Sequence, residues 1–216
     1  MSTGMAEIVG DVGGPAHPYD CSVPALPVVP ATLSLAVPAA ERLEDYLEMI
    51  DASHLAGEDG EGYNLVITSI IRRDPAEYLR RLAELARGVD LPEGWVPMST
   101  RWLIDSSADA AGRVAGEARL RHALSPSLEI EGGHVGYFIG REHRGRGFGN
   151  AILALALREL ASLGIDRVLI TCNADNTRSR RVIERNGGVF DRYTISPKSG
   201  KQVMRFWIEN QKSSHG

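Results

Sequence analysis

The chain has few cysteines, and their positions show no metal-binding pattern. Cys21 and Cys172 are the two cysteines among 216 residues, and they lie far apart in unlike sequence contexts. Zinc sites need their ligands at short, regular spacings, which these cysteines lack, and one disulfide between them is not expected. A reducing compartment is the simpler expectation, so we predict a cytoplasmic protein.

Sequence signals for a membrane or for export are also missing. No apolar stretch reaches the roughly eighteen residues that a transmembrane helix needs. No Lys or Arg precedes Arg42, so the basic first region of a secretory signal is absent. The sequence therefore predicts no membrane partner.

Neither sign of charge is in large excess. The formal net charge at pH 7 is −4, from 24 Lys and Arg against 28 Asp and Glu. This balance argues against a nucleic-acid-binding protein, whose surface is usually basic. The six histidines are scattered. We therefore expect neither a nucleic acid nor a metal as partner.

The composition is that of a globular domain with an unusual first segment. Apolar residues make up 43% and charged residues 24% of the chain, which suits a protein that buries a core. The first segment is rich in Gly, Pro and Ala, and its prolines block a helix. We interpret residues 1–31 as an extended or disordered leader, 32–209 as one domain and 210–216 as a tail. A leader that wraps around the domain or a neighbouring subunit is the alternative.

Hydrophobic periodicity predicts an α/β chain with elements in the order β-α-α-β-β-β-α-β-α-β-β. Strands are expected at 32–38, 99–105, 112–122, 132–140, 166–172, 189–195 and 201–209. Helices are expected at 39–56, 74–88, 149–163 and 175–188. Asp74 and Asp175 are expected to cap the second and fourth helices. Residues 58–64 are expected to form a polar loop, and the apolar strand 166–172 suggests a buried parallel pairing.

A turn that alternates arginine and glycine precedes the most apolar helix. The segment RGRGFG runs from Arg144 to Gly149. The first amides of a helix have no partner inside it, and the helix dipole adds partial positive charge there, so an anion fits this place. Glycines leave the backbone bare and arginines add charge. We predict a pyrophosphate cradle, and a surface turn with solvated arginines is the alternative.

Two well-known phosphate cradles do not match this turn. A P-loop needs Lys followed by Ser or Thr after its last glycine, and residues 148–151 contain neither. The dinucleotide fingerprint G-x-G-x-x-G needs a third glycine where the chain has Asn150. The cradle must therefore belong to another class of protein.

The same segment matches R/Q-x-x-G-x-G/A and resembles the acyl-CoA signature of the GNAT N-acetyltransferase superfamily, with a strand before it and a helix after it. About thirty residues later, CNADNTRSRRVIERNGGVF resembles the second motif of that family. The predicted order of elements also matches the family from about residue 32 to 209. The stretches RWLID, GEARLRH, GGHVGYFIG, ITCNADN and RFWIE resemble a bacterial subgroup of predicted acetyltransferases.

The resemblance implies the GNAT acyl-CoA N-acyltransferase fold, with a mixed central sheet, helices on both faces and a cleft between splayed parallel strands at 133–140 and 166–172. It implies acetyl-CoA as co-substrate and a primary amine, of a small molecule or of a peptide or protein, as acceptor. The residues implied to bind the coenzyme are Ile139, Gly140, Arg141, Arg144, Gly145, Arg146, Gly147, Phe148, Gly149, Asn150, Asn176 and Ser179. A helix-start residue that bonds its own backbone is the alternative role of Asn176.

The resemblance also implies that the amine attacks the thioester directly, while both substrates are bound, and a base must then take its proton. We favour His134, at the start of the splayed strand, and next Glu117, in the middle of its own strand. The alternatives are a His134 bonded to backbone and a Glu117 paired with Arg119 or Arg121.

Many members of the family use a Tyr in the second-motif helix as the acid, but Ile183 stands at that position here. Tyr137 and Tyr193 are replacements, although a packing role in their strands is the simpler expectation. The missing Tyr keeps open a second function, a catalytically silent acyl-CoA-binding sensor or scaffold. A homodimer through the last hairpin or the leader is expected by family analogy alone.

Overall fold

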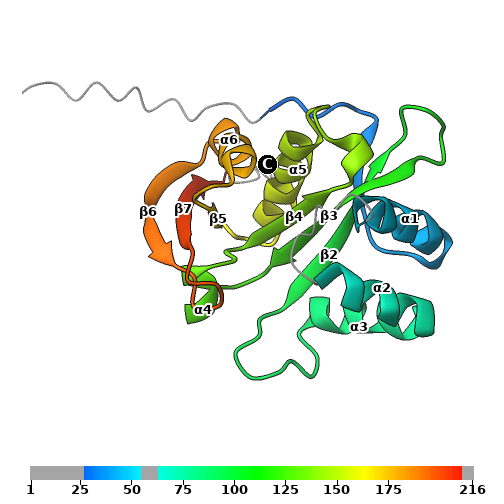
Figure 1. Ribbon diagram of the computed structural model, residues 1–216, viewed down its shortest axis with the longest axis horizontal. Coiled ribbons are helices and arrows are strands. Elements are labelled where there is room, and N and C mark those ends of the chain that lie inside the picture. The colour runs from blue at the N-terminus through cyan, green and yellow to red at the C-terminus, as the bar shows by residue number, and fades with distance from the viewer. Residues whose placement is uncertain (1–26, 55–62, 211–216) are drawn as a thin grey trace, which may run out of the picture.

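Two antiparallel sheets form the centre of the computed structural model, which describes residues 27–54 and 63–210 (Figure 1). The first sheet has the order β1-β2-β3-β4 and the second the order β5-β7-β6. The strands of the first sheet are Leu33–Ala36, Met98–Asp105, Arg113–Arg121 and Val135–Ile139. In the second sheet β5 is Arg167–Asn173, β6 is Val189–Ile195 and β7 is Gln202–Glu209. The consecutive strands β2 and β3, and likewise β6 and β7, pair as antiparallel hairpins.

Helices cover both faces of the first sheet, as predicted (Figure 1). The α-helices are α1 Leu43–His54, α2 Tyr63–Arg73, α3 Pro75–Arg87, α4 Pro126–Ile130, α5 Phe148–Ser162 and α6 Thr177–Arg185. Short 3₁₀ turns lie at Ala40–Arg42 and Arg141–His143. The first three helices pack on one face of the sheet, and α5 packs on the other. No helix in the described part of the chain is long and apolar enough to cross a bilayer.

Local sequence signals decide the ends of α3. The Asp74 side chain accepts a hydrogen bond of 3.0 Å from the Glu77 amide, and Pro75 occupies the first turn. Gly88 ends the helix at a φ of 72°, in the left-handed region that glycine enters without strain. The predicted Asp74 cap of this helix is therefore confirmed.

Two helices were not predicted. Tyr63 and Asn64 were expected in a polar loop, but they begin α2, and residues 58–62 of that loop lie outside the described residues. Isoleucine, valine and threonine dominate the rest of α2, and these β-branched residues have low helix propensity. Packing overrides this propensity, because α2 contacts α1 and α3 and buries Ile71. The five-residue α4 lies in a segment where no helix was expected.

The first cap of α6 also differs from the prediction. Asn176, not Asp175, is the cap, and its side-chain oxygen accepts a hydrogen bond of 3.0 Å from the Ser179 amide. Asp175 is one residue too early for this geometry, because α6 begins at Thr177.

The two sheets meet at the predicted splay between β4 and β5, but the sheet is divided there. Every ladder in the described residues is antiparallel, and β5 pairs with β7 rather than forming the expected parallel ladder. Near the start of both strands, the His134 amide donates to the Leu169 carbonyl at 2.7 Å. The apolar character of β5 instead reflects the burial of Val168, Leu169 and Ile170.

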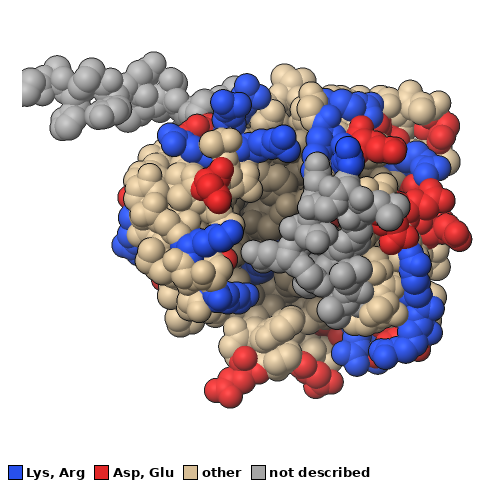
Figure 2. Space-filling model, in the orientation of Figure 1, with Lys and Arg blue, Asp and Glu red and all other residues tan. Residues whose placement is uncertain are grey.

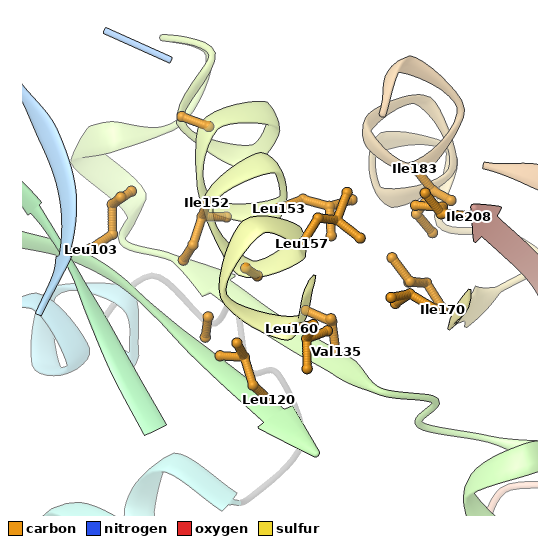
Figure 3. Packing of buried hydrophobic residues seen from close by; sticks show 14 of the residues in the cluster. Leu103, Leu120, Val135, Ile152, Leu153, Leu157, Leu160, Ile170, Ile183 and Ile208 are labelled. Atoms are coloured by element: carbon orange, nitrogen blue, oxygen red, sulfur yellow. The ribbon is translucent and has the colours of Figure 1, made fainter. Parts of the chain in front are cut away.

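In the core, α5 packs between the two sheets and α6. Ile152, Leu153, Leu157 and Leu160 are fully buried, and Figure 3 shows them between side chains of both sheets and of α6. Each such side chain contributes about 1.5–3 kcal/mol of burial free energy. The amino end of α5, and the glycine-rich turn before it, are therefore held on a rigid element.

Candidate functional site

A groove of about 760 Å³ lies between the carboxyl end of β4, the amino end of α5 and helix α6. Figure 2 shows a hollow beside the α6 region, with Lys and Arg side chains at its rim. Predicted coenzyme-binding residues that line the groove are Ile139, Arg144, Gly145, Gly147, Phe148, Gly149, Asn150, Asn176 and Ser179. Gly140, Arg141 and Arg146 do not line it. The structure therefore brings together both sequence motifs, which are about thirty residues apart.

The glycine-rich turn presents bare backbone to this groove. Gly145 and Gly147 have φ values of 76° and 84°, which favour glycine, and a β-carbon at either would meet no atom of the described residues within 4 Å. No side chain caps α5, and the amides of Phe148 and Gly149 find no acceptor among the described residues. The Asn150 amide already donates to the Gly147 carbonyl at 3.0 Å. The open amides therefore lie just before Asn150.

Gly149 serves a different purpose from the two glycines before it. A β-carbon at Gly149 would come within 3.1 Å of the Val182 side chain. Its missing side chain therefore lets α5 approach α6 closely.

The two arginines of the turn point in different directions. Arg144 lines the groove, and its Nε donates to the Ile139 carbonyl at 3.0 Å. Arg146 instead approaches the buried carboxylate of Asp105 at 3.3 Å and lies over the Phe148 ring at 4.6 Å. Burial acts to raise the pKa of Asp105, but hydrogen bonds from Ser107 and the charge of Arg146 hold it below its ordinary value. Arg146 therefore braces the turn from outside the groove.

Three arginines of α6 line the groove and were missed. Arg178, Arg181 and Arg185 follow one another at spacings of three and four, which places them on one helix face. Another face of the helix carries an ion pair, between Arg180 and Glu184 at 2.7 Å. The spacing of the three arginines in the second motif was the sequence signal for this wall.

A smaller cavity of about 290 Å³ shares Tyr137, Asn176 and Ser179 with the groove. It lies along the gap between β4 and β5, and Arg119 and Cys172 are among its other walls. At the junction, the hydroxyl groups of Tyr137 and Ser179 are 3.1 Å apart. Burial raises the pKa of Tyr137 to about 12 and that of Cys172 to about 11. Both side chains are therefore protonated at neutral pH.

Neither residue expected as the base lines these two cavities. His134 is buried, and its Nδ1 accepts a hydrogen bond of 2.9 Å from the Leu169 amide. Burial, and next the charge of Arg121, lower the pKa of His134, so the ring is neutral at pH 7. The Nδ1 lone pair that a base would use is already bonded to backbone.

Glu117 faces the side of the sheet that carries α1. It is buried, and its carboxylate accepts a hydrogen bond of 2.6 Å from the Tyr46 hydroxyl. The other oxygen lies 3.1 Å from Nε of Arg119. The Tyr46 ring stacks on Trp102 at 4.6 Å, so the whole arrangement is packed.

The position of the usual acid and its two possible replacements lie in different parts of the structure. Ile183 is completely buried in the core, so its position belongs to packing rather than to the groove. Tyr193 is half exposed on β6 against Phe190 and lies outside the groove. Tyr137 alone of the two tyrosines reaches the site. Among the described residues, no cluster of His, Cys, Asp and Glu suited to a metal ion occurs.

Comparison with known proteins identifies, over most of the chain, the family that the sequence motifs resemble. The family model described as "Acetyltransferase (GNAT) domain" matches residues 34–189. No curated protein matches. Among solved structures, the microcin C7 self-immunity acetyltransferase MccE, in complex with acetyl-CoA and AMP, has a TM-score of 0.60 at 17% identity, covering 88% of this chain and 99% of that one.

Two further solved structures have the same fold. RimL, the ribosomal L7/L12 alpha-N-protein acetyltransferase in complex with coenzyme A, has a TM-score of 0.59 at 17% identity, covering 85% of this chain and 97% of that one. A chimera of spermidine N-acetyltransferase SpeG from Vibrio cholerae and hSSAT has a TM-score of 0.52 at 16% identity, covering 83% and 96%. At such identities the likeness shows the fold alone. Because the family model spans most of the sequence, the chain belongs to the GNAT acetyltransferase family.

Proposed function

We propose that this protein is an acetyl-CoA-dependent N-acetyltransferase that acetylates a primary amine of a small molecule, peptide or protein while both substrates are bound. One observation carries the proposal. A groove lined by bare backbone and arginines meets a second, smaller cavity at the Tyr137 and Ser179 hydroxyl groups. Such an arrangement suits one long anionic substrate and one separate acceptor.

The groove fits the coenzyme at its phosphate end. The open amides before Asn150, together with Arg144, suit a diphosphate, and Gly145 and Gly147 leave room for it. The MccE and RimL structures were solved with acetyl-CoA and coenzyme A, respectively. When bound, acetyl-CoA supplies the activated acetyl group.

The open edge of β4 fits an extended chain beside it. The Gly140 amide donates to the Ala115 carbonyl of β3 at 2.9 Å. Successive residues of a strand direct their polar backbone groups to opposite edges, so those of Ile139 and Tyr137 face the gap. The Arg141 amide instead approaches the Ser53 hydroxyl, at 3.4 Å. We therefore assign backbone contacts with the pantetheine arm to Ile139 and Tyr137 rather than to Arg141.

The 290 Å³ cavity is the place we assign to the acceptor amine. It shares three walls with the groove, so a bound amine reaches the inner end of the groove from the other side of the gap. The Tyr137 and Ser179 hydroxyl pair lies at that junction, and we assign to it the proton that the departing thiolate needs.

The two residues first expected as base are assigned positioning roles. His134 holds β4 against β5 at the closed end of the gap, through its backbone and its ring. Glu117 orients Arg119, which lines the acceptor cavity. We infer that water in the cavity takes the amine proton.

Release of coenzyme A thiol from acetyl-CoA, measured over a panel of amines, tests the proposal. We expect release that depends on a particular amine, with the acetylated amine found by mass spectrometry in equal amount. Tight coenzyme A binding without turnover on a broad panel of small and peptide amines would instead support a catalytically silent acyl-CoA-binding protein. The observation that favours this alternative is Ile183 at the position where many family members have the acidic Tyr. Absence of both binding and turnover would refute both.

A further inference from the structure

The arginines of α6 that line the groove lack carboxylate partners. In the part of the chain that the structure describes, Arg178, Arg181 and Arg185 form no ion pair, whereas Arg180 on the same helix pairs with Glu184. No Asp or Glu is among the described residues that line the groove. The wall therefore carries positive charge that no described carboxylate in the groove balances.

This charge adds to that of the glycine-rich turn. Arg144 stands on the opposite side of the groove from α6, and burial, together with the nearby charge of Arg178, lowers its pKa. Like charges held near one another raise the electrostatic free energy of the protein alone, and an anion between them removes this cost. The groove is therefore built for a ligand with several negative charges.

Because the proposed function assigns the diphosphate to the bare amides and Arg144, the α6 arginines are left for another anionic group. Guanidinium groups on one helix face bind a terminal phosphate well, because each offers two parallel N–H donors. A phosphate monoester carries nearly two negative charges at pH 7, more per group than a diphosphate linkage.

We propose that the face formed by Arg178, Arg181 and Arg185 is a phosphate-monoester subsite that binds the 3′-phosphate on the ribose of coenzyme A. This inference rests on the proposed function, and it makes the protein selective for coenzyme A over dephospho-coenzyme A. The two ligands differ by that phosphate alone. The subsite would also favour adenosine 3′,5′-bisphosphate over AMP as a competitor.

The test compares the Kd values of coenzyme A and dephospho-coenzyme A by calorimetry on the full chain. For the wild-type protein we expect dephospho-coenzyme A to bind at least about tenfold more weakly, because charge-assisted hydrogen bonds to the phosphate are lost. In the variant R178A/R181A/R185A, the Kd of coenzyme A should rise to the level of that of dephospho-coenzyme A. The Kd of dephospho-coenzyme A itself should change much less.

The single variants R181A and R180A are a matched pair, because the two residues are neighbours on one helix and each substitution removes one positive charge. R181A should reduce the preference for coenzyme A, and R180A should leave it unchanged. Circular dichroism and the denaturation midpoint check that each variant is folded. A double-mutant cycle between the arginine and the phosphate isolates their coupling.

The outcomes separate this inference from the function it rests on. Equal binding of both ligands by the wild-type protein, or an equal loss from R180A and R181A, would overturn the subsite and leave the acetyltransferase proposal standing. Failure of the wild-type protein to bind either ligand would overturn both. A preference for coenzyme A that the triple variant abolishes establishes the subsite.

Discussion

Gly147 and Gly164 lie at opposite ends of α5 and have similar, positive φ values. Their φ values are 84° and 78°, and a β-carbon at either meets no atom within 4 Å in the part of the chain that the structure describes. Replacing each by Val should therefore cost a similar stability, about 1–2 kcal/mol, from the left-handed backbone. Gly147 lines the groove and Gly164 does not.

We expect Gly147→Val to weaken coenzyme A binding at least about tenfold, because its side chain occupies the phosphate end of the groove. Gly164→Val should leave the Kd within about twofold of the wild-type value. Calorimetry with coenzyme A measures the Kd, and urea unfolding measures the stability. Equal Kd values for the two variants would contradict the assignment of the cradle.

Tyr137 offers a second test at a single atom. Tyr137→Phe keeps the ring and removes the hydroxyl that contacts Ser179. If the hydroxyl pair supplies a proton to the thiolate, kcat should fall about 10²-fold, while the KM for acetyl-CoA changes little. Tyr193→Phe is the control, because Tyr193 is half exposed on β6. An unchanged kcat in Tyr137→Phe would exclude the hydroxyl from the chemistry.

His134 connects two elements, β4 and β5, and its pKa makes this connection depend on pH. Burial lowers its pKa below the ordinary 6.5, so the folded state favours the neutral ring. The unfolded state then binds more protons as the pH falls below about 6.5, and the free energy of unfolding decreases with acidification. Partly buried His122 and His143, whose pKa values are also lowered, act in the same direction.

His134→Asn should reduce this pH dependence, because Asn does not titrate and its side-chain oxygen can accept from the Leu169 amide. Urea unfolding at pH 7 and pH 5 should show a smaller loss of stability in this variant than in the wild-type protein. His134→Ala leaves the amide without an acceptor and should cost about 1–3 kcal/mol at pH 7. The same pH dependence in wild type and His134→Asn would show that His134 contributes none of it.

At the scale of elements, the sequence predicted well where short-range signals decide. The start and end of α3 follow from Asp74, Pro75 and Gly88, and these signals act within one helical turn. The helix α2 was missed because its β-branched residues favour a strand locally, and packing against the neighbouring helices α1 and α3 overrides that preference. The partner of β5 was missed because burial makes a strand apolar whichever way its neighbours run.

At the scale of the whole molecule, packing and hydrogen bonds extend slightly beyond residues 32–209. Val29 packs against the core, and the Asn210 side chain donates to the carbonyls of Leu157 and Ile165, at 2.8 and 3.1 Å. Urea unfolding of two fragments, 27–210 and 32–209, measures what these end contacts contribute. A fragment of 32–209 should be less stable by about 2–3 kcal/mol, from lost burial and hydrogen bonds. Equal stability of both fragments would show that these end contacts contribute little.

The sequence by itself determined the family, the glycine-rich turn and its place before α5, because these depend on residues that are close together in the chain. The tertiary structure alone decided which charges meet. Arg146 pairs with Asp105 outside the groove, and Arg178 lines the groove. The Nδ1 of His134 accepts a hydrogen bond from the Leu169 amide. The partner of His134 is 35 positions away in the sequence and that of Arg146 is 41 positions away. Local sequence patterns therefore could not predict these contacts.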